Sequence, residues 1–423
     1  MTNQPTQQGS AANGHRLATS QPPLSVNDAL SLFMEHAHPV SDIEIVDMGH
    51  TLGRVLAKDQ ISSIDVPRHD NSAMDGYAIR SQDMVEHEIS RLNVNQRISA
   101  GTVGKMLSFG CAARIFTGAP IPPGADAVVA QEECAIQGDQ ISIRQRVCPG
   151  ENIRPRGNAI TAGATILKRG IKIFPQEMAL AASMGLATLP VYRRLRVAIF
   201  STGNELVKLD SPLQDAQIYD SNRYALLGLL QEMGCEINDL GITADGPSAT
   251  RNTLREAANV GDLIITSGGV SVGEDDYVKQ AVKDVGQLDV WRVAIKPGKP
   301  LAFGSVQGIP IVGLPGNPVA TCVTFLVFVR PFLKRMQGIK DVANKMIQVP
   351  AGFRRTRAKN RREYARARLC IDSGGTVTTK LYPKQGSDIL TSMTWAHGLV
   401  EIPERQPIKP GQPVRFFPFS ELV

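Results

Sequence analysis

The stretch "DLIITSGG" (residues 262–269) is an apolar run of strand length that ends in a Gly-Gly turn. Three similar runs, "LRVAIFS" (195–201), "CEINDLG" (235–241) and "IPIVGLPG" (309–316), alternate with helical patterns such as "SNRYALLGLLQEMG" (221–234). Near-continuous apolar strands that alternate with helices are typical of a parallel sheet covered on both faces. The sequence therefore predicts a central three-layer α/β domain with a mostly parallel sheet.

The rest of the chain differs in character, and 423 residues are too many for a single hydrophobic core. The first residues are rich in Gln, Asn, Ser and Thr, so we expect them to be disordered. Short strand-like runs with Gly and Pro turns indicate one β domain inserted into a helical domain and another β domain at the end. The predicted segments are a disordered extension (1–22), a helical linker domain (23–60 with 150–190), the inserted β domain (61–149), the α/β domain (191–340) and the last β domain (346–423).

Two helices outside the α/β region have clear end signals. Ser25 stands as an N-cap before an apolar-periodic run, and Asp28 follows it in capping-box spacing. Pro175 opens the pattern "PQEMALAASMG", which Gly185 closes. The sequence therefore predicts helices that begin close to Ser25 and to Pro175.

The net charge of +6 is concentrated in one run, "RRTRAKNRREYARAR" (354–368), which holds eight Arg or Lys against one Glu. Such a run suits nucleic-acid binding, or else a solvated pair of strands joined by a charged turn. Tyr364 is its only aromatic residue, so base stacking has little support. A smaller anionic ligand fits the run better, and we expect no nucleic-acid partner.

The sequence supports neither a membrane-spanning protein nor a protein stabilised by disulfides. The longest apolar stretch near a helical pattern, "VATCVTFLVFV" (319–329), has 11 residues, which is too short to span a bilayer, and the first residues show no apolar signal region. The six cysteines are scattered without a CxxC pair. We therefore expect a cytoplasmic protein with reduced, mostly buried thiols and no zinc site.

Polar clusters follow the predicted parallel strands: "STGNEL" (201–206), "TADG" (243–246), "TSGGVSVGEDD" (266–276) and "GLPGNP" (313–318). Ligands of open α/β sheets bind beyond the carboxyl ends of the strands, so these loops should share one rim. Each motif alone suits an ordinary turn or loop cap, and neither a P-loop nor a dinucleotide fingerprint is present. Together, the rim brings three carboxylates and two lysines to a site that suits Mg²⁺ with a phosphorylated substrate, namely Glu205, Asp245, Asp276, Lys296 and Lys299.

The inserted β region carries a polar cluster of its own in "DVPRHDNSAMDGYAIR" (65–80) and "RIFTGAPIPPGADAVV" (114–129). Asp75 and Thr117 lie within these two stretches. A pair of well-capped loops explains them, but this density of hydrogen-bonding groups is more often functional than structural.

Eight motifs in unbroken order resemble the MoeA family of molybdopterin molybdenumtransferases, which also includes the carboxyl-terminal domain of gephyrin. The resemblance covers residues 24–423. It implies an α/β domain similar to the molybdopterin adenylyltransferases, a last domain folded as a β barrel, and a homodimer. The motifs are "DNSAMDGYAIR", "RIFTGAPIPPGADAVV", "NIRPRGNAI", "STGNEL", "IYDSNR", "SGGVSVGEDDYVK", "AIKPGKPLAFG" and "GLPGNPVATCVTF".

The resemblance also implies a reaction, which is insertion of molybdate into adenylylated molybdopterin with Mg²⁺ assistance and release of AMP. It names a molybdopterin adenylyltransferase and acceptor molybdoenzymes as candidate protein partners. The implied catalytic residues are Asp75, Thr117, Glu205, Asp245, Asp276 and Lys296, with Glu205 and Asp276 as metal ligands. The implied substrate-binding residues are Ser267, Gly268, Gly269, Ser271, Arg292, Lys299, Pro315, Gly316, Asn317, Arg366 and Ser387.

Two positions depart from the family pattern. Gly157-Asn158-Ala159 stands where the family usually has Gly-Glu-Asp, so a commonly used carboxylate is missing. Trp291-Arg292 replaces a frequent Trp-Lys, which keeps the positive charge. The missing carboxylate keeps open an impaired paralogue and a non-catalytic scaffold like gephyrin. A molybdopterin adenylyltransferase is a third alternative, because that is the activity of the relatives of the α/β domain alone.

Overall fold

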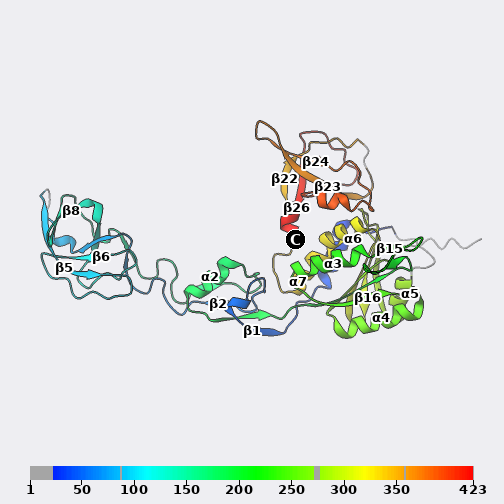
Figure 1. Ribbon diagram of the computed structural model, residues 1–423, viewed down its shortest axis with the longest axis horizontal. Helices are drawn as coiled ribbons and strands as arrows, with labels where there is room; N and C mark the ends of the chain where they lie inside the picture. Colours follow the sequence, from blue (N-terminus) through cyan, green and yellow to red (C-terminus); the bar gives the residue numbers. More distant parts are fainter. Residues whose placement is uncertain (1–21, 86–87, 271–276, 357–358, 423) are drawn as a thin grey trace, which may run out of the picture. The chain divides into compact units, whose positions relative to one another are not determined.

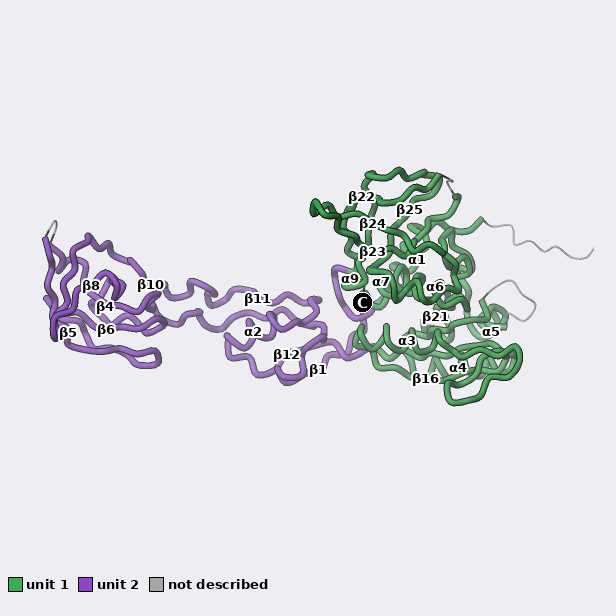
Figure 2. The backbone as a smooth tube through the Cα atoms, turned by 45° about the horizontal axis from the view of Figure 1, so that its top comes forward, with its two compact units in different colours: residues 1–38, 195–335, 342–423 green, residues 39–194, 336–341 purple. Residues whose placement is uncertain are grey.

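The structure is a computed structural model that describes residues 22–85, 88–270, 277–356 and 359–422 (Figure 1). Of the predicted disordered extension, residues 1–21 therefore lie outside the described part. The chain forms two compact units, which Figure 2 shows in different colours. Unit 1 combines residues 1–38, 195–335 and 342–423, and unit 2 combines residues 39–194 and 336–341.

Unit 1 contains a six-stranded sheet in the order β16-β13-β17-β21-β20-β18. The first four strands are parallel, β20 runs antiparallel to β21, and β18 runs antiparallel to β20. The prediction of a mostly parallel sheet is confirmed. The strands are β13 (Arg196–Thr202), β16 (Glu236–Thr243), β17 (Leu263–Ser267), β18 (Gly286–Arg292), β20 (Pro300–Val306) and β21 (Ile309–Leu314).

Helices cover both faces of this sheet because its strands are apolar on both sides. In β13, Ala198 and Phe200 pack in one core cluster with Leu254 of α4, whereas Val197 and Ile199 point the other way and are also buried. Figure 1 shows α4 and α5 on one side of the sheet and α3 and α6 on the other. These helices are α3 (Ser221–Glu232), α4 (Pro247–Val260), α5 (Tyr277–Val285) and α6 (Pro318–Thr324).

Helix α1 (Val26–Glu35) belongs to the same unit. Ser25 caps it as the sequence predicts, because the Ser25 side chain accepts a hydrogen bond from the Asp28 amide. The Phe33 ring stacks on Phe303 of β20 with a centroid distance of 4.1 Å. The first helix is therefore held by a strand that lies far along the chain.

A single long helical segment follows β21 in unit 1. Helix α6 continues through a π-helical stretch (Phe325–Val329) into α7 (Arg330–Met336). The apolar run 319–329 is buried throughout. Among the described residues, no helix combines the length and the apolar character that crossing a bilayer requires.

The second sheet of unit 1 has the order β19-β23-β25-β26-β22, with β24 paired to the other side of β23. Ala351, just after β22, forms a β-bridge with Thr379 of β24. The two ends of the sheet therefore meet at these strands. Strand β19 joins this sheet through the pairs Ile295↔Arg362 and Lys296↔Glu363. The strands are β19 (Ile295–Lys296), β22 (Ile347–Pro350), β23 (Arg362–Ile371), β24 (Val377–Leu381), β25 (Gly398–Ile402) and β26 (Pro413–Pro418).

Unit 2 contains a six-stranded sheet within the inserted β region, in the order β7-β4-β6-β5-β9-β8. Its remaining part holds α2 (Pro175–Ser183), which begins at Pro175, and Gly185 just beyond its end has a φ of 77°. Both predicted signals of this helix are confirmed. The sheet strands are β4 (Gly76–Ile79), β5 (Ser90–Ile98), β6 (Cys111–Ile115), β7 (Ala127–Ala130), β8 (Cys134–Gln137) and β9 (Gln140–Ile143).

Short two-stranded pairs complete unit 2: β1 with β12, β2 with β11, and β3 with β10. These three pairs are antiparallel, whereas unit 1 has a short parallel pair, β14 with β15. The strands are β1 (Ile43–Asp47), β2 (Gln60–Ile61), β3 (Asn71–Ser72), β10 (Ile153–Arg154), β11 (Thr165–Leu167), β12 (Thr188–Tyr192), β14 (Leu206–Val207) and β15 (Ile218–Tyr219).

None of the six cysteines forms a disulfide. The expectation that most of them are buried is wrong, because Cys322 alone is buried while Cys148 is exposed and the other four are half-buried. Cys111 and Cys134 begin β6 and β8, Cys235 directly precedes β16, and Cys370 lies next to the end of β23, so most of the cysteines are at or beside strand ends.

Candidate functional site

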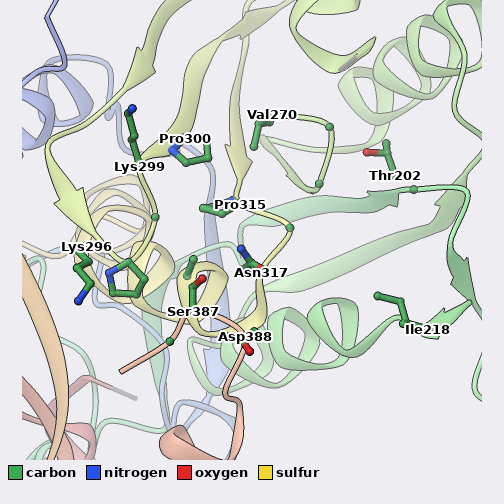
Figure 3. A pocket seen from close by; sticks show the side chains of 18 of the residues that line it. Thr202, Ile218, Val270, Lys296, Lys299, Pro300, Pro315, Asn317, Ser387 and Asp388 are labelled. Atoms are coloured by element: carbon green, nitrogen blue, oxygen red, sulfur yellow. The ribbon is translucent and has the colours of Figure 1, made fainter. Parts of the chain in front are cut away.

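A cavity of about 930 Å³ opens in unit 1 beyond the carboxyl ends of the parallel strands (Figure 3). Loops that follow β13, β16, β17 and β21 line it, together with the turn after β19 and a loop of the second sheet. Ten of the predicted site residues line this cavity: Glu205, Asp245, Gly268, Gly269, Lys296, Lys299, Pro315, Gly316, Asn317 and Ser387.

The Gly-Gly turn after β17 brings the backbone unusually close to the neighbouring strand. Gly268 and Gly269 have φ values of 89° and 63°, which residues with a Cβ rarely adopt. A Cβ on Gly268 would lie 2.5 Å from the Thr202 carbonyl oxygen, and one on Gly269 would lie 2.7 Å from Thr202 Oγ1. Only glycine fits here, and the turn therefore faces the cavity with backbone rather than side chains.

The loops after β13 and β16 carry the acidic residues. The Asn204 amide donates to Asp245 Oδ2 at 2.9 Å, so the two loops are bonded to each other. The Glu205 carboxylate makes no hydrogen bond or ion pair with any described residue, although it lines the cavity. Its oxygens are hard donors free for a ligand, which suits Mg²⁺ because this ion takes one or two carboxylates and fills its other positions with phosphate oxygens and water.

Two lysines lie on the side of the cavity opposite Thr202 and Ile218 (Figure 3). Lys296 Nζ donates to Glu363 Oε1 at 2.7 Å, whereas Lys299 is exposed and has no ion pair within the described part of the chain. Burial lowers the pKa of Lys296 against the opposing effect of Glu363. One lysine is thus already partnered, and the other carries an uncompensated charge.

Glu363 has a second cationic partner, since Arg355 Nη2 donates to the same Oε1 at 3.3 Å. Burial alone would raise the pKa of Glu363, yet Lys296 and Arg355 hold that pKa below its ordinary value. The carboxylate is therefore a fixed anion between the two cations.

Arg366 does not line the cavity, because its side chain is fully buried. Its Nη2 donates to the Gly386 carbonyl at 2.7 Å and its Nε to Ser392 Oγ at 2.9 Å. Burial lowers its pKa to about 10. Arg366 is therefore bonded to the loop that carries Ser387, next to the cavity, and its own side chain is not part of the lining.

Four other predicted residues are not placed at the cavity surface. Ser267 is buried at the end of β17 and lies 3.3 Å from Ser201 through their hydroxyl oxygens. Arg292 ends β18, where it pairs with Pro300, and does not line the cavity. Ser271 and Asp276 lie outside the described residues.

Asp75 and Thr117 belong to unit 2 and lie together there. Both the amide and the hydroxyl of Thr117 donate to Asp75 Oδ1 at 2.8 Å. These two bonds, the amide first, lower the pKa of Asp75. The acid is therefore ionised and keeps its second oxygen for another partner.

The stretch Gly157-Asn158-Ala159, where the resembled family usually has acidic residues, also lies in unit 2. The Ala159 amide donates to the Val66 carbonyl at 2.9 Å, and its side chain is exposed. The nearby Asp65 accepts from the Ala162 amide at 2.8 Å and from Arg156 Nε at 2.5 Å, and these bonds lower its pKa. Both Asp65 oxygens are thus engaged, which leaves it unsuited to replace the missing carboxylate.

Several lining residues were not predicted from the sequence. Gln385, Gly386 and Asp388 flank Ser387, so the motif "KQGSD" that contains them already held a signal. Arg361 belongs to the basic run, but charge alone does not show which of its eight cations faces the cavity. The remaining unpredicted lining residues are Thr202, Gly203, Ile218, Val270, Pro297, Gly298, Pro300 and Ala320.

Comparison with known proteins gives matches along almost the whole chain. Residues 24–185 match the MoeA N-terminal region (domain I and II), residues 198–335 a probable molybdopterin binding domain, and residues 348–419 the MoeA C-terminal region (domain IV). A molybdopterin molybdenumtransferase of Haemophilus influenzae is 35% identical over 403 residues, which cover 95% of this chain and 100% of the relative.

Another molybdopterin molybdenumtransferase, from Nostoc, is 43% identical over 307 residues, which cover 70% of each chain. Among solved structures, the molybdopterin biosynthesis moeA protein of Pyrococcus horikoshii OT3 matches with a TM-score of 0.81 and 28% identity. That match covers 93% of this chain and 99% of the other.

Proposed function

Because this chain belongs to the MoeA family and is a molybdopterin molybdenumtransferase of molybdenum cofactor biosynthesis, we propose that the cavity of unit 1 inserts molybdate into adenylylated molybdopterin and releases AMP. One observation carries this proposal. A single cavity is lined by acidic side chains, a glycine turn and two lysines, which together suit an anionic substrate that brings a divalent cation.

The cationic side is proposed to bind molybdate. Molybdate is a dianion, and it must approach a substrate whose phosphates and dithiolate are also negative. A pair of unit charges about 4 Å apart interacts with roughly 4 kcal/mol at an effective dielectric of 20, against roughly 1 kcal/mol in bulk water. Lys299 and Lys296, next to the Ser387 loop that Arg366 holds, would supply this compensation.

The opposite side is proposed to hold the pyrophosphate bridge. The Gly268-Gly269 turn offers backbone amides to phosphate oxygens, and Pro315, Gly316 and Asn317 lie on the neighbouring loop. Ile218 bonds through its amide to the Glu205 carbonyl, which fixes the Glu205 backbone on this side. We assign Asp245 as a supporting hydrogen-bond acceptor, because it already bonds the Asn204 amide.

Glu205 and Asp276 are the proposed Mg²⁺ ligands, of which Asp276 lies outside the described residues. Among the described residues, no cluster of three or more carboxylate, His or Cys ligands exists. Two carboxylates therefore suit a Mg²⁺ ion that takes its other ligands from substrate oxygens and water. When bound, Mg²⁺ would stabilise the charge that develops as AMP departs.

Direct assay of the purified protein tests the reaction. With adenylylated molybdopterin as substrate, we expect AMP release only when molybdate and Mg²⁺ are both present. Release that ignores molybdate would indicate a hydrolase, and AMP formation from ATP would indicate an adenylyltransferase. Failure to act on either substrate would leave the scaffold interpretation.

We further infer a cytoplasmic homodimer, in which Asp75 and Thr117 complete the functional set. The implied dimer comes from the family resemblance, and six free thiols agree with a reducing compartment. Light scattering should give about twice the 45.7 kDa of one chain, and cell fractionation should find the protein with cytoplasmic markers.

Ala159→Asp should raise the single-turnover rate at least about tenfold, since a positioned carboxylate typically contributes 10²–10⁴. Ala159 is exposed, so the larger side chain fits without steric cost, and Asp65 is already engaged by Arg156 and Ala162. Ala159→Asn is the neutral control of nearly equal size. An unchanged or lower rate for the aspartate variant would show that another group already replaces the missing acid.

A further inference from the structure

The C-terminal sheet of unit 1 contains a second, smaller cavity of about 340 Å³. Four cationic residues of the basic run line it: Arg354, Arg355, Lys359 and Arg361. Among the described residues that line it, Glu363 is the only acidic one, and the others are Thr356, Ile402, Pro403 and Gln406. Four cations thus surround a space that holds one carboxylate, and we call this cavity the basic pocket.

The charge of the basic pocket is poorly compensated within the protein. Arg354, Lys359 and Arg361 form no ion pair with any residue that the structure describes. Arg355 shares Glu363 with Lys296, so that carboxylate already faces two cations. Like charges this close repel one another, and an additional anion would relieve that repulsion.

Arg355 gives a second, independent sign of a missing partner. Its Nε is buried and has no hydrogen-bond acceptor among the described residues, although its Nη2 bonds Glu363. Buried polar groups without a partner are uncommon in folded proteins and call for an acceptor. The Arg355 side chain is still 31% exposed, so the N–H groups at its open edge are suited to receive an oxyanion.

The shape and lining of the pocket select the kind of anion. No aromatic side chain is among its described lining residues, so a nucleic-acid base or an adenine ring finds no stacking surface there. Of the described lining residues, Ile402 and Pro403 are the apolar ones, which leaves little surface for the organic part of a larger ligand. The remaining class is a small, multiply charged oxyanion.

We propose that the basic pocket is a second binding site for a free tetrahedral oxyanion of the molybdate, sulfate and phosphate class. It adjoins the main cavity, because Arg361 lines both. Glu363 connects them as well, since it bonds Arg355 of the basic pocket and Lys296 of the main cavity. An anion bound to Arg355 competes with Glu363 for that cation, so the occupancies of the two cavities influence each other reciprocally. Anion binding by the basic pocket depends on its cations and not on the reaction in the main cavity, so it goes beyond the proposed function.

Calorimetric titration of the full chain with sodium molybdate tests the proposal without any activity measurement. The wild-type protein should bind two molybdate ions per chain. The double variant Arg355→Gln, Lys359→Gln should lose one of them, with its dissociation constant raised at least about tenfold. Lys380→Gln is the matched control, because Lys380 is exposed on β24 and lines neither cavity. Thermal melting reports whether each variant is folded, and Lys359→Gln alone, a change at an exposed residue, serves if the double variant is not.

Parallel titrations with sulfate, phosphate and AMP distinguish the source of the oxyanion. Weakening of inorganic phosphate or sulfate binding by the same double variant would support a site for free oxyanions. Weakening that affects AMP alone would overturn the proposal in favour of a nucleotide phosphate site. The proposal would also be overturned if the double variant still bound two molybdate ions per chain. Displacement of molybdate from this pocket by a short single-stranded oligonucleotide would overturn it too.

Discussion

Glu205→Gln should lower the rate of AMP release from adenylylated molybdopterin by about 100-fold at saturating molybdate, in the range that a lost electrostatic contact at a reacting group typically costs. The substitution keeps size and shape and removes the negative charge. Its structural cost should be small, because Glu205 bonds the Ile218 amide through its backbone carbonyl and its carboxylate has no partner among the described residues. Single-turnover rates at several Mg²⁺ concentrations measure the effect.

The matched control for this experiment is Asp210→Asn. Asp210 is an exposed carboxylate on the chain segment that follows Glu205, and it does not line the cavity. It should react at the wild-type rate. If Glu205→Gln also reacts at the wild-type rate at every Mg²⁺ concentration, the assignment of Glu205 to the metal is wrong, while the family membership of the chain stands.

Arg366→Lys should raise the molybdate concentration needed for half-maximal AMP release by about tenfold or more. Lysine keeps the charge but replaces a planar guanidinium that donates from two nitrogens at once. It cannot hold both the Gly386 carbonyl and Ser392 Oγ, so the loop that carries Ser387 should lose its fixed position. A loss of about 1.4 kcal/mol corresponds to the tenfold change.

Arg368→Lys on the same strand is the control, since Arg368 lies over the Trp395 ring and does not line the cavity. A change confined to the molybdate dependence, with the limiting rate preserved, would agree with a positioning role. Wild-type behaviour of Arg366→Lys would instead show that its charge alone matters.

The strands and helices of the α/β region could be predicted because their apolar periods are long and their ends carry Gly and Pro signals. The same logic places polar loops at one rim, and seven of the ten predicted residues that line the cavity lie on loops after β13, β16, β17 and β21. The physical reason is that parallel strands send their carboxyl ends to one edge. Positions that present backbone to the cavity, such as Gly268, can also be predicted, because the Gly-Gly turn that they require is visible in the sequence.

Partners that meet across long sequence separations could not be predicted. Lys296 appears in the sequence as a free cation of a Pro-Gly turn, but the pairing of β19 with β23 places it beside Glu363. Arg366 belongs to the same run as Arg361, yet one is buried and the other lines the cavity. A charge count cannot separate them, because strand alternation and the local loop decide which face each side chain takes.

The stacking of Phe33 on Phe303 has a consequence for the time course of synthesis. About 270 residues separate the two rings, so at ~5–20 residues per second the ribosome needs roughly 10 to 60 s between them. During that interval α1 has only ten residues and no surface to pack on, and a helix of this length is marginal in water. Residues 39–194, by contrast, leave the ribosome early with almost all of unit 2 complete. Nascent chains stalled before residue 300 should therefore present a protease-resistant unit 2 and a protease-sensitive α1, and binding of a nascent-chain chaperone should concentrate on that exposed first helix.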